Sequence, residues 1–176
     1  KPLTEEYRMF DSTAEMGAPL IGRTVSAIYV SESLLTFDTD AGQVSYEVEG
    51  DCCSSSYFHD VVGVEHLLSN GPVTAFEEVD LQPGDPGYHD PACETSWTGP
   101  AACGSSHDAL EVYGYRLTTE HPKFGPVSTV IAFRNDSNGY YGGWMERVDG
   151  EVRPDQHRVT SDVLGPLDRA FGEVSA

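Results

Sequence analysis

The sequence predicts one α+β domain, built mainly on an antiparallel sheet of about six to seven strands with one short central helix and a long Pro/Gly-rich loop. Three observations support this fold class. Apolar and polar residues alternate over several short runs, as in half-buried strands, whereas one segment has apolar residues at three-to-four-residue spacing. The 18 Gly and 11 Pro indicate short elements joined by turns.

The chain of 176 residues has the usual size of one domain, and no polar linker divides it. We expect residues 1–20 to form an N-terminal extension with a short helix over residues 5–10, and residues 21–150 to form the domain. The remaining residues, 151–176, are expected to form a C-terminal tail with one helical piece near residues 167–171.

The expected strands cover, in chain order, residues 25–29, 34–37, 44–48, 73–81, 110–118, 126–134 and 141–148. The first three form an antiparallel meander, because a turn at residues 40–42 reverses the chain between the second and the third. Between the last two, Asn138-Gly139 is the strongest short hairpin signal in the chain.

The central helix is expected over residues 57–68, after three serines able to cap its first turn. Its apolar positions recur every three to four residues: Tyr57, Val61, Val64 and Leu68. Residues 70–72, Asn-Gly-Pro, end it, because they combine tolerance of positive φ with a residue that does not continue a helix.

The charge is strongly negative, with 29 Asp and Glu against 10 Lys and Arg and a formal net charge of −19. Such a surface repels phosphate backbones and anionic lipid, so we expect no direct nucleic-acid or membrane partner. A cationic protein partner, mimicry of nucleic acid and a merely solubilising surface all remain open. No run of 18 apolar residues and no signal peptide is visible, so we expect a soluble protein. The four cysteines are too few and too unevenly placed for a disulfide-stapled scaffold, which indicates a reducing compartment.

Two adjacent cysteines lie between the third strand and the expected helix. Backbone N–H groups at a helix N-terminus stabilise anions and lower thiol pKa values, so Cys52 or Cys53 is a candidate nucleophile. His59, one helical turn further on, is the candidate base, with Asp51 or Asp60 orienting it, as in a thiol-dependent hydrolase. The alternatives are a structural corner and a ligand-binding pocket formed by the same Asp and Cys residues.

The expected loop over residues 82–107 contains a second group of chemically active side chains. His89, Cys93, Cys103 and His107 have the residue types of a closed Cys2His2 site, so structural zinc is a candidate cofactor that would hold the loop. The spacing lacks the Cys-x2-Cys pairs of common zinc fingers. A Cys93–Cys103 disulfide and unlinked residues are the alternatives.

A third candidate site surrounds the Asn-Gly turn. Its Asn, Ser and Tyr side chains are typical of adaptable recognition loops, which combine hydrogen bonding with aromatic contact. The candidate binding residues are Asn135, Ser137, Asn138, Tyr140 and Tyr141. The alternative is a plain hairpin whose glycines satisfy the turn while the tyrosines face the sheet.

Two segments, residues 50–54 (GDCCS) and 134–143 (RNDSNGYYGG), resemble an uncharacterised domain family of small bacteriophage and bacterial proteins. In this family a GDCCS-type motif precedes a short helix and an NSNGYYGG-type hairpin comes near the end. The resemblance covers roughly residues 21–148 and brings no established activity with it. It implies a phage-related protein, located in the host cytoplasm or associated with the virion.

We further expect the two motifs to meet in space, with both cysteines and both tyrosines forming one wall of a pocket or one rigid corner. The expected function is that of a non-enzymatic, phage-type accessory protein, which engages a protein partner through its acidic surface or the hairpin loop. Nucleic-acid mimicry and a virion component are two versions of this. The alternative is the thiol-dependent hydrolase centred on Cys52, Cys53 and His59.

Overall fold

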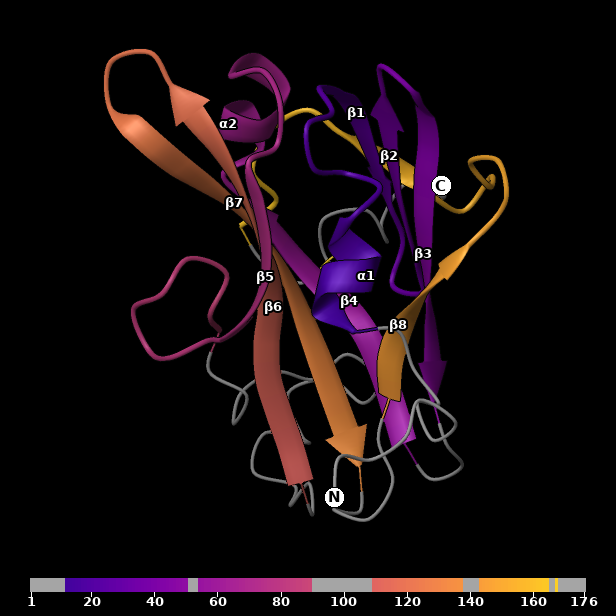
Figure 1. Cartoon of the computed structure of the whole chain (residues 1–176). Helices are drawn as coiled ribbons and strands as arrows, with labels where there is room; N and C mark the ends of the chain where they lie inside the picture. Colours follow the sequence, from indigo (N-terminus) through magenta and orange to yellow (C-terminus); the bar gives the residue numbers. More distant parts are fainter. Residues whose placement is uncertain (1–11, 51–53, 90–108, 138–142, 165–166, 168–176) are drawn as a thin grey trace, which may run out of the picture.

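The computed structural model describes residues 12–50, 54–89, 109–137, 143–164 and 167. These residues form two antiparallel sheets (Figure 1). The first sheet has the strand order β8-β3-β2-β1-β9, and the second has the order β4-β7-β6-β5. The prediction of a mainly antiparallel fold is therefore confirmed, with nine strands in the described residues instead of six or seven.

The first sheet begins with the meander that the sequence predicts. Its strands are β1 (Val25–Val30), β2 (Leu34–Thr39), β3 (Gly42–Gly50), β8 (Gly143–Val148) and β9 (His157–Val159). β1 pairs with β2 and β2 with β3, both antiparallel, and Gly42 turns the chain between the last two with a φ of 113°. β8 pairs with β3 at one edge, and β9 pairs with β1 at the other.

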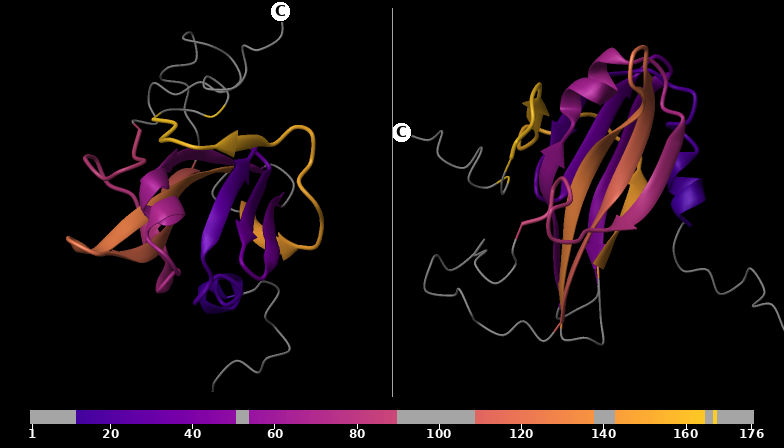
Figure 2. Two further views of the ribbon diagram at one scale, coloured as in Figure 1. Left: turned by 90° about the horizontal axis from the view of Figure 1, so that it is seen from above. Right: turned by 90° about the vertical axis from the view of Figure 1, so that its left-hand side faces the viewer.

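The second sheet contains the longest strands. They are β4 (Ser54–Val62), β5 (Ala75–Asp80), β6 (Ala109–His121) and β7 (Gly125–Ser137). β6 and β7 pair over their whole lengths and form a long hairpin, which projects beyond the rest of the fold (Figures 1 and 2). Two short helices complete the described elements: α1 (Thr13–Gly17) and α2 (Val64–Ser69).

The prediction of a helix starting near residue 57 is wrong, because this segment is the second half of β4. The error has a physical cause. Phe58 pairs with Phe133, but Asp60 pairs with Ala132, so His59 is the extra residue of a β-bulge. The bulge turns Phe58 and Val61 to the same core-facing side and so interrupts the two-residue alternation of a strand. The predicted helix combined Tyr57 and Val61, which lie in β4, with Val64 and Leu68, which lie in α2.

The real helix, α2, is six residues long and is capped from a distance. Gly63 at its N-cap position has a φ of 78° and no side chain to offer. Asp162 supplies the cap instead, since its Oδ1 accepts from the backbone N–H groups of Gly63 at 2.8 Å and Val64 at 2.9 Å. A residue of the expected C-terminal tail therefore caps a helix that lies about a hundred residues before it in the sequence.

Both ends of the described chain pack onto the domain. At the start of α1, Ser12 and Glu15 form a reciprocal capping box. Met16 in this helix and Leu20 after it are buried in the core. Near the other end, Gln156 is buried and donates to the backbone carbonyl of Tyr29 on β1 and to Leu34 and Thr36 on β2. The helix expected over residues 5–10 lies outside the described residues. So does the expected helical piece, except for Leu167, which is helical and buried.

The core lies between the two sheets and is rich in aromatic side chains. Tyr46 from β3 stacks on Phe76 from β5 at 6.4 Å, and Phe76 stacks on Tyr115 from β6 at 5.7 Å. Burial raises the pKa of Tyr46, whose hydroxyl donates to the carbonyl of Met16 in α1. In the described ranges, no helix has the length and apolar character needed to cross a membrane.

Candidate functional site

The described flanks of the two motif segments, at the ends of β3, β4, β7 and β8, lie at the same end of the molecule (Figure 1). The chain passes from the first sheet to the second between β3 and β4, and it returns between β7 and β8. Gly50 pairs with Gly143, and Ser54 pairs with Ser137, so the flanks of both motifs are direct neighbours, as expected. The central residues lie outside the described part of the chain: Asp51, Cys52, Cys53, Asn138, Tyr140 and Tyr141.

The expectation of a β-hairpin around Asn138-Gly139 is wrong. A hairpin requires that the flanking strands pair with each other, but β7 pairs with β4 and β6, whereas β8 pairs with β3. The segment after Ser137 therefore connects two sheets. Tertiary pairing overrides the local turn signal, because β7 pairs along its whole length with β6 and β8 pairs along its whole length with β3.

Asn135 joins the two sheets at this corner. Its side-chain Oδ1 accepts from Ser56 Oγ and from the backbone N–H of Gly143, both at 2.9 Å. Its Nδ2 donates to Glu111 Oε2 at 2.8 Å. A backbone N–H only donates and an ionised carboxylate only accepts, so the orientation of this amide is unambiguous. One buried side chain thus links β4, β6, β7 and β8.

Gly143 is required at this corner by its close approach to β4. A Cβ at this position would lie 1.9 Å from Ser56 Oγ and 2.5 Å from Ser56 Cβ. No larger residue fits without displacing Ser56, which is itself bonded to Asn135. The first glycine of β8 is therefore a packing requirement, independent of its φ angle.

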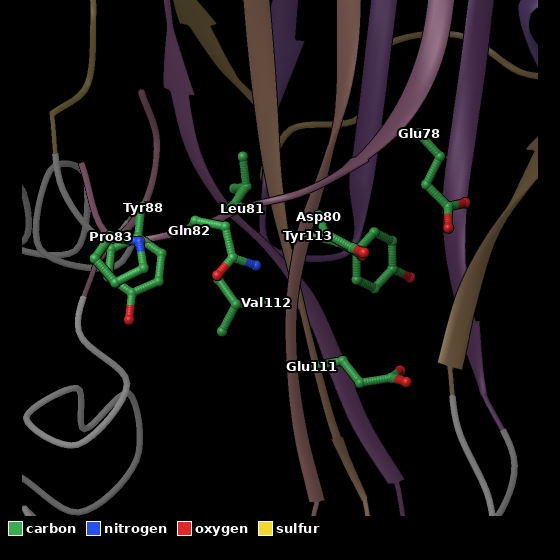
Figure 3. A pocket seen from close by; sticks show the side chains of 9 residues that line it. All are labelled: Glu78, Asp80, Leu81, Gln82, Pro83, Tyr88, Glu111, Val112 and Tyr113. Atoms are coloured by element: carbon green, nitrogen blue, oxygen red, sulfur yellow. The ribbon is translucent and has the colours of Figure 1, made fainter. Parts of the chain in front are cut away.

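Next to Glu111, a groove of about 450 Å³ opens beside β5 and β6 (Figure 3). Its described lining residues are Glu78, Asp80, Leu81, Gln82, Pro83, Tyr88, Glu111, Val112 and Tyr113. The three charged residues among them are all acidic. Partial burial raises the pKa of Glu78 above its ordinary value of 4.5, and the negative charges of Asp80 and Glu111 raise it further.

Aromatic and apolar side chains form the remaining walls of the groove. The ring of Tyr113 lies 5.0 Å from that of Phe133 and 5.9 Å from that of Tyr115, which fixes its position. Burial raises the pKa of Tyr113, so its hydroxyl stays neutral at physiological pH. At the far end, Tyr88 packs on a small apolar cluster that includes Leu81. Sequence reasoning missed this groove, although Glu78 and Asp80 have the two-residue spacing that places side chains on one face of a strand.

A buried polar cluster lies on the outer side of the second sheet. His89 Nε2 is 2.7 Å from Oδ2 of the fully buried Asp60, and the ring of His89 lies 5.2 Å from that of the buried His59. Nη2 of the buried Arg134 donates to the carbonyl oxygen of His89 at 2.7 Å. Two histidines that the sequence assigned to different sites are thus neighbours, and they hold residues 82–89 against the sheet.

The zinc prediction falls mostly outside the described residues. His89 is described, but Cys93, Cys103 and His107 are not. Within the part of the chain that the structure describes, no three His, Cys, Asp or Glu side chains are placed to hold a metal ion. Structural zinc therefore stays a prediction.

The prediction of a thiol nucleophile assumed that a helix begins directly after Cys52 and Cys53, and this assumption is wrong. Residues 54–62 form a strand, so no helix N-terminus follows the cysteines. His59 lies five residues along β4 from Ser54, roughly 16 Å away at the rise of a strand, rather than one helical turn. Moreover, Asp60 bonds His89. Cys52 and Cys53 themselves lie outside the described residues.

No protein-family model, curated protein or solved structure matches this chain. The resemblance to the bacteriophage and bacterial domain family therefore depends on the two motifs alone.

Proposed function

We propose that this protein is a non-enzymatic binding protein, which engages a partner protein by taking a cationic segment into the groove beside β5 and β6. The observation that carries this proposal is that the three charged residues lining the groove, Glu78, Asp80 and Glu111, are all acidic. In addition to partial burial, the charges of Asp80 and Glu111 raise the pKa of Glu78, so the three acidic groups repel one another. A bound cation would relieve that repulsion.

An organic cation fits the groove better than a metal ion does. The described carboxylates do not converge as metal ligands, whereas a Lys or Arg side chain needs only a nearby negative field and room for its alkyl stem. Tyr113 adds an aromatic surface beside the acids, and aromatic faces attract cations. A volume of about 450 Å³ is typical of pockets that take a small ligand or a few side chains.

The corner supports the groove by holding Glu111 in place. Its carboxylate accepts from Asn135, whose other contacts reach both sheets. A carboxylate fixed in this way is ready for a partner without further ordering, which favours affinity. In the phage context that the motif resemblance implies, the partner would be a host or virion protein with an exposed basic segment.

The test uses a fluorescein-labelled peptide that contains two Lys residues flanking one Phe, and its anisotropy is measured during titration with the protein. We expect the binding to weaken as salt increases, because the attraction is ionic. Asp80→Asn should weaken it roughly tenfold, equivalent to about 1.4 kcal/mol.

Glu77→Gln is the matched control. Glu77 precedes Glu78 on β5, points to the opposite face of the strand and pairs with Arg116 at 2.9 Å. Both variants remove one negative charge, so general attraction to an acidic protein changes equally. Equal weakening in the two variants, or no salt dependence, would contradict the proposal.

A further inference from the structure

The β6–β7 hairpin ends in a turn that exposes an aromatic side chain. Phe124 is 69 % exposed and is the one large aromatic residue with this property among the residues that the structure describes. Lys123 Nζ lies 5.3 Å from the centre of its ring. We call residues 121–125 the tip; it is the projecting end of the long hairpin in Figure 1.

The tip is held in one conformation by its own contacts. Nδ1 of His121 accepts from the backbone N–H groups of Lys123 at 3.0 Å and Phe124 at 3.2 Å. The His121 and Phe124 rings lie 4.6 Å apart. Pro122 has a fixed φ suited to a tight turn, and Gly125 closes it with a φ of 76°. Phe124 is therefore presented to solvent by a rigid turn, which lowers the entropic cost of binding through it.

The tip and the groove are chemically complementary. The groove combines three carboxylates with Tyr113, Tyr88 and apolar side chains, and the tip combines a primary amine with an exposed phenyl ring. Lys123 is also one of only two lysines in a chain of net charge −19, and it is the one that the structure describes. This cation stands beside the exposed aromatic ring instead of being paired within its own chain's groove.

The two sites lie at opposite ends of the same strand. Glu111 and His121 are ten residues apart on β6, roughly 33 Å at the rise of a strand. β6 pairs with β7 along its whole length, which keeps the hairpin extended. A tip therefore does not reach the groove of its own chain, although it is free to enter the groove of another.

We propose that the partner segment taken by the groove is the tip of a second copy of this chain, with Lys123 among the carboxylates and Phe124 against Tyr113. The inference rests on the proposed function of the groove. The contact joins two different surfaces, so it is heterologous, and its repetition produces an open chain or a ring of copies.

The net charge opposes such assembly at low ionic strength. At 0.15 M salt the Debye length is about 8 Å, which screens the repulsion between whole molecules but weakens direct contacts less. One amine and one ring form a small interface, so we expect weak association, with a dissociation constant on the order of 100 µM.

Sedimentation velocity on three proteins tests the inference. The wild type should sediment faster as its concentration rises, beyond the value of a dimer. A tip variant, Lys123→Glu with Phe124→Ser, and a groove variant, Asp80→Lys, should each remain monomeric. An equal mixture of the two variants should form a one-to-one dimer, because the intact tip of one enters the intact groove of the other and no further contact is possible.

Cross-linking supplies a second readout. A carbodiimide joins amines to carboxylates at no added length, and a mixture of ¹⁴N- and ¹⁵N-labelled wild type identifies links between copies. We expect links from Lys123 to Glu78, Asp80 or Glu111. Wild type that stays monomeric at about 1 mM, or variants that fail to associate on mixing, would overturn the inference.

Binding of the labelled Lys-Phe-Lys peptide shows whether only the self-assembly inference is wrong or the proposed function of the groove is wrong as well. If the tip variant, whose groove is unchanged, binds the peptide while the wild type stays monomeric, the groove has another partner and only self-assembly is wrong. If the wild type neither binds the peptide nor associates, both proposals are wrong. Equal circular dichroism spectra and melting temperatures for all proteins establish that the variants are folded.

Discussion

The two ends of the second sheet differ in what β6 and β7 do there: at one end they link the two sheets, and at the other they form an exposed turn. At the corner, β6 and β7 carry Glu111 and Asn135, whose side chains bond each other and link strands of both sheets. At the tip, the same strands end in a turn in which the rings of His121 and Phe124 lie 4.6 Å apart and Phe124 is exposed. From this difference we expect substitutions at the corner to lower the unfolding free energy and substitutions at the tip to affect association alone. The groove lies at the corner end and should show both effects.

The largest loss of stability is expected from Gly143→Ala at the corner. The new Cβ would overlap Ser56, and overpacking of this kind costs about 3 kcal/mol of unfolding free energy. Urea denaturation measures the loss. Adding Ser56→Gly to Gly143→Ala removes the overlapping atoms and should restore part of the stability. A double variant no more stable than Gly143→Ala would show that the contact with Ser56 is not the cause.

Asn135→Asp should cost about 2 kcal/mol at neutral pH, because it replaces a donor to Glu111 with a second carboxylate and leaves two acceptors facing each other. Two carboxyl groups at this distance raise each other's pKa, so the shared proton is bound more tightly in the folded state. The loss should therefore be present at high pH and should shrink as pH falls into the acidic range. Urea denaturation at several pH values checks this, and a loss independent of pH would contradict the assigned contact.

A smaller effect of opposite sign is expected from Glu78→Gln in the groove. The pKa of Glu78 is raised in the folded protein, so the folded state binds this proton more tightly than the unfolded state does. Stability from this group is thus full below the ordinary pKa of 4.5 and is lost as pH rises through the raised value. Gln should stabilise the protein at neutral pH by about 0.5 kcal/mol after solvent screening, and the gain should vanish below pH 4.5.

Thermal denaturation at several pH values measures the effect of Glu78→Gln, and Glu77→Gln is the matched control. Glu77→Gln removes an equal charge from the other face of β5 and loses the exposed pair with Arg116, so it should not stabilise the protein. A gain from Glu77→Gln as large as that from Glu78→Gln would mean that only the net charge matters.

The smallest effect on stability is expected at the tip. Phe124→Ser removes a side chain that contacts its own turn, so the unfolding free energy should change by less than about 0.5 kcal/mol. Thermal denaturation measures this at a concentration where the protein is monomeric. A larger loss would show that the tip supports the fold and would remove the contrast between the two ends of the sheet.

Sequence patterns predicted the fold best where neighbouring residues decide it. The alternation in β1, β2 and β3 and the turn at Gly42 correctly predicted a meander, because these strands pair with their neighbours along the chain. In β4, the bulge at His59 interrupts the alternation of a strand, and the spacing of Tyr57 and Val61 fits a helix equally well. Only pairing with β7 distinguishes these two possibilities, and that partner is some 70 residues away in the sequence.

In the candidate site, too, the sequence predicted some features, whereas others depend on contacts between distant strands. The adjacency of the two motifs was anticipated from their positions beside apolar strands, and pairing of Gly50 with Gly143 agrees with it. The role of Asn135 as a link between sheets was not foreseeable, since it depends on Ser56 and Glu111 from other strands. His59 and His89 were assigned to separate sites, because the sequence does not show that residues 82–89 fold back over β4.

By itself, the sequence determined the antiparallel character of the fold, the strong negative charge and the preference of residues 40–42 for a turn. These properties depend on composition and on contacts between near neighbours. Tertiary structure alone decided that β7 and β8 enter different sheets, that Asp162 caps α2 and that Glu78, Asp80 and Glu111 share one groove. The physical reason is that each of these depends on the pairing of distant strands, whose stability comes from burying the whole core at once.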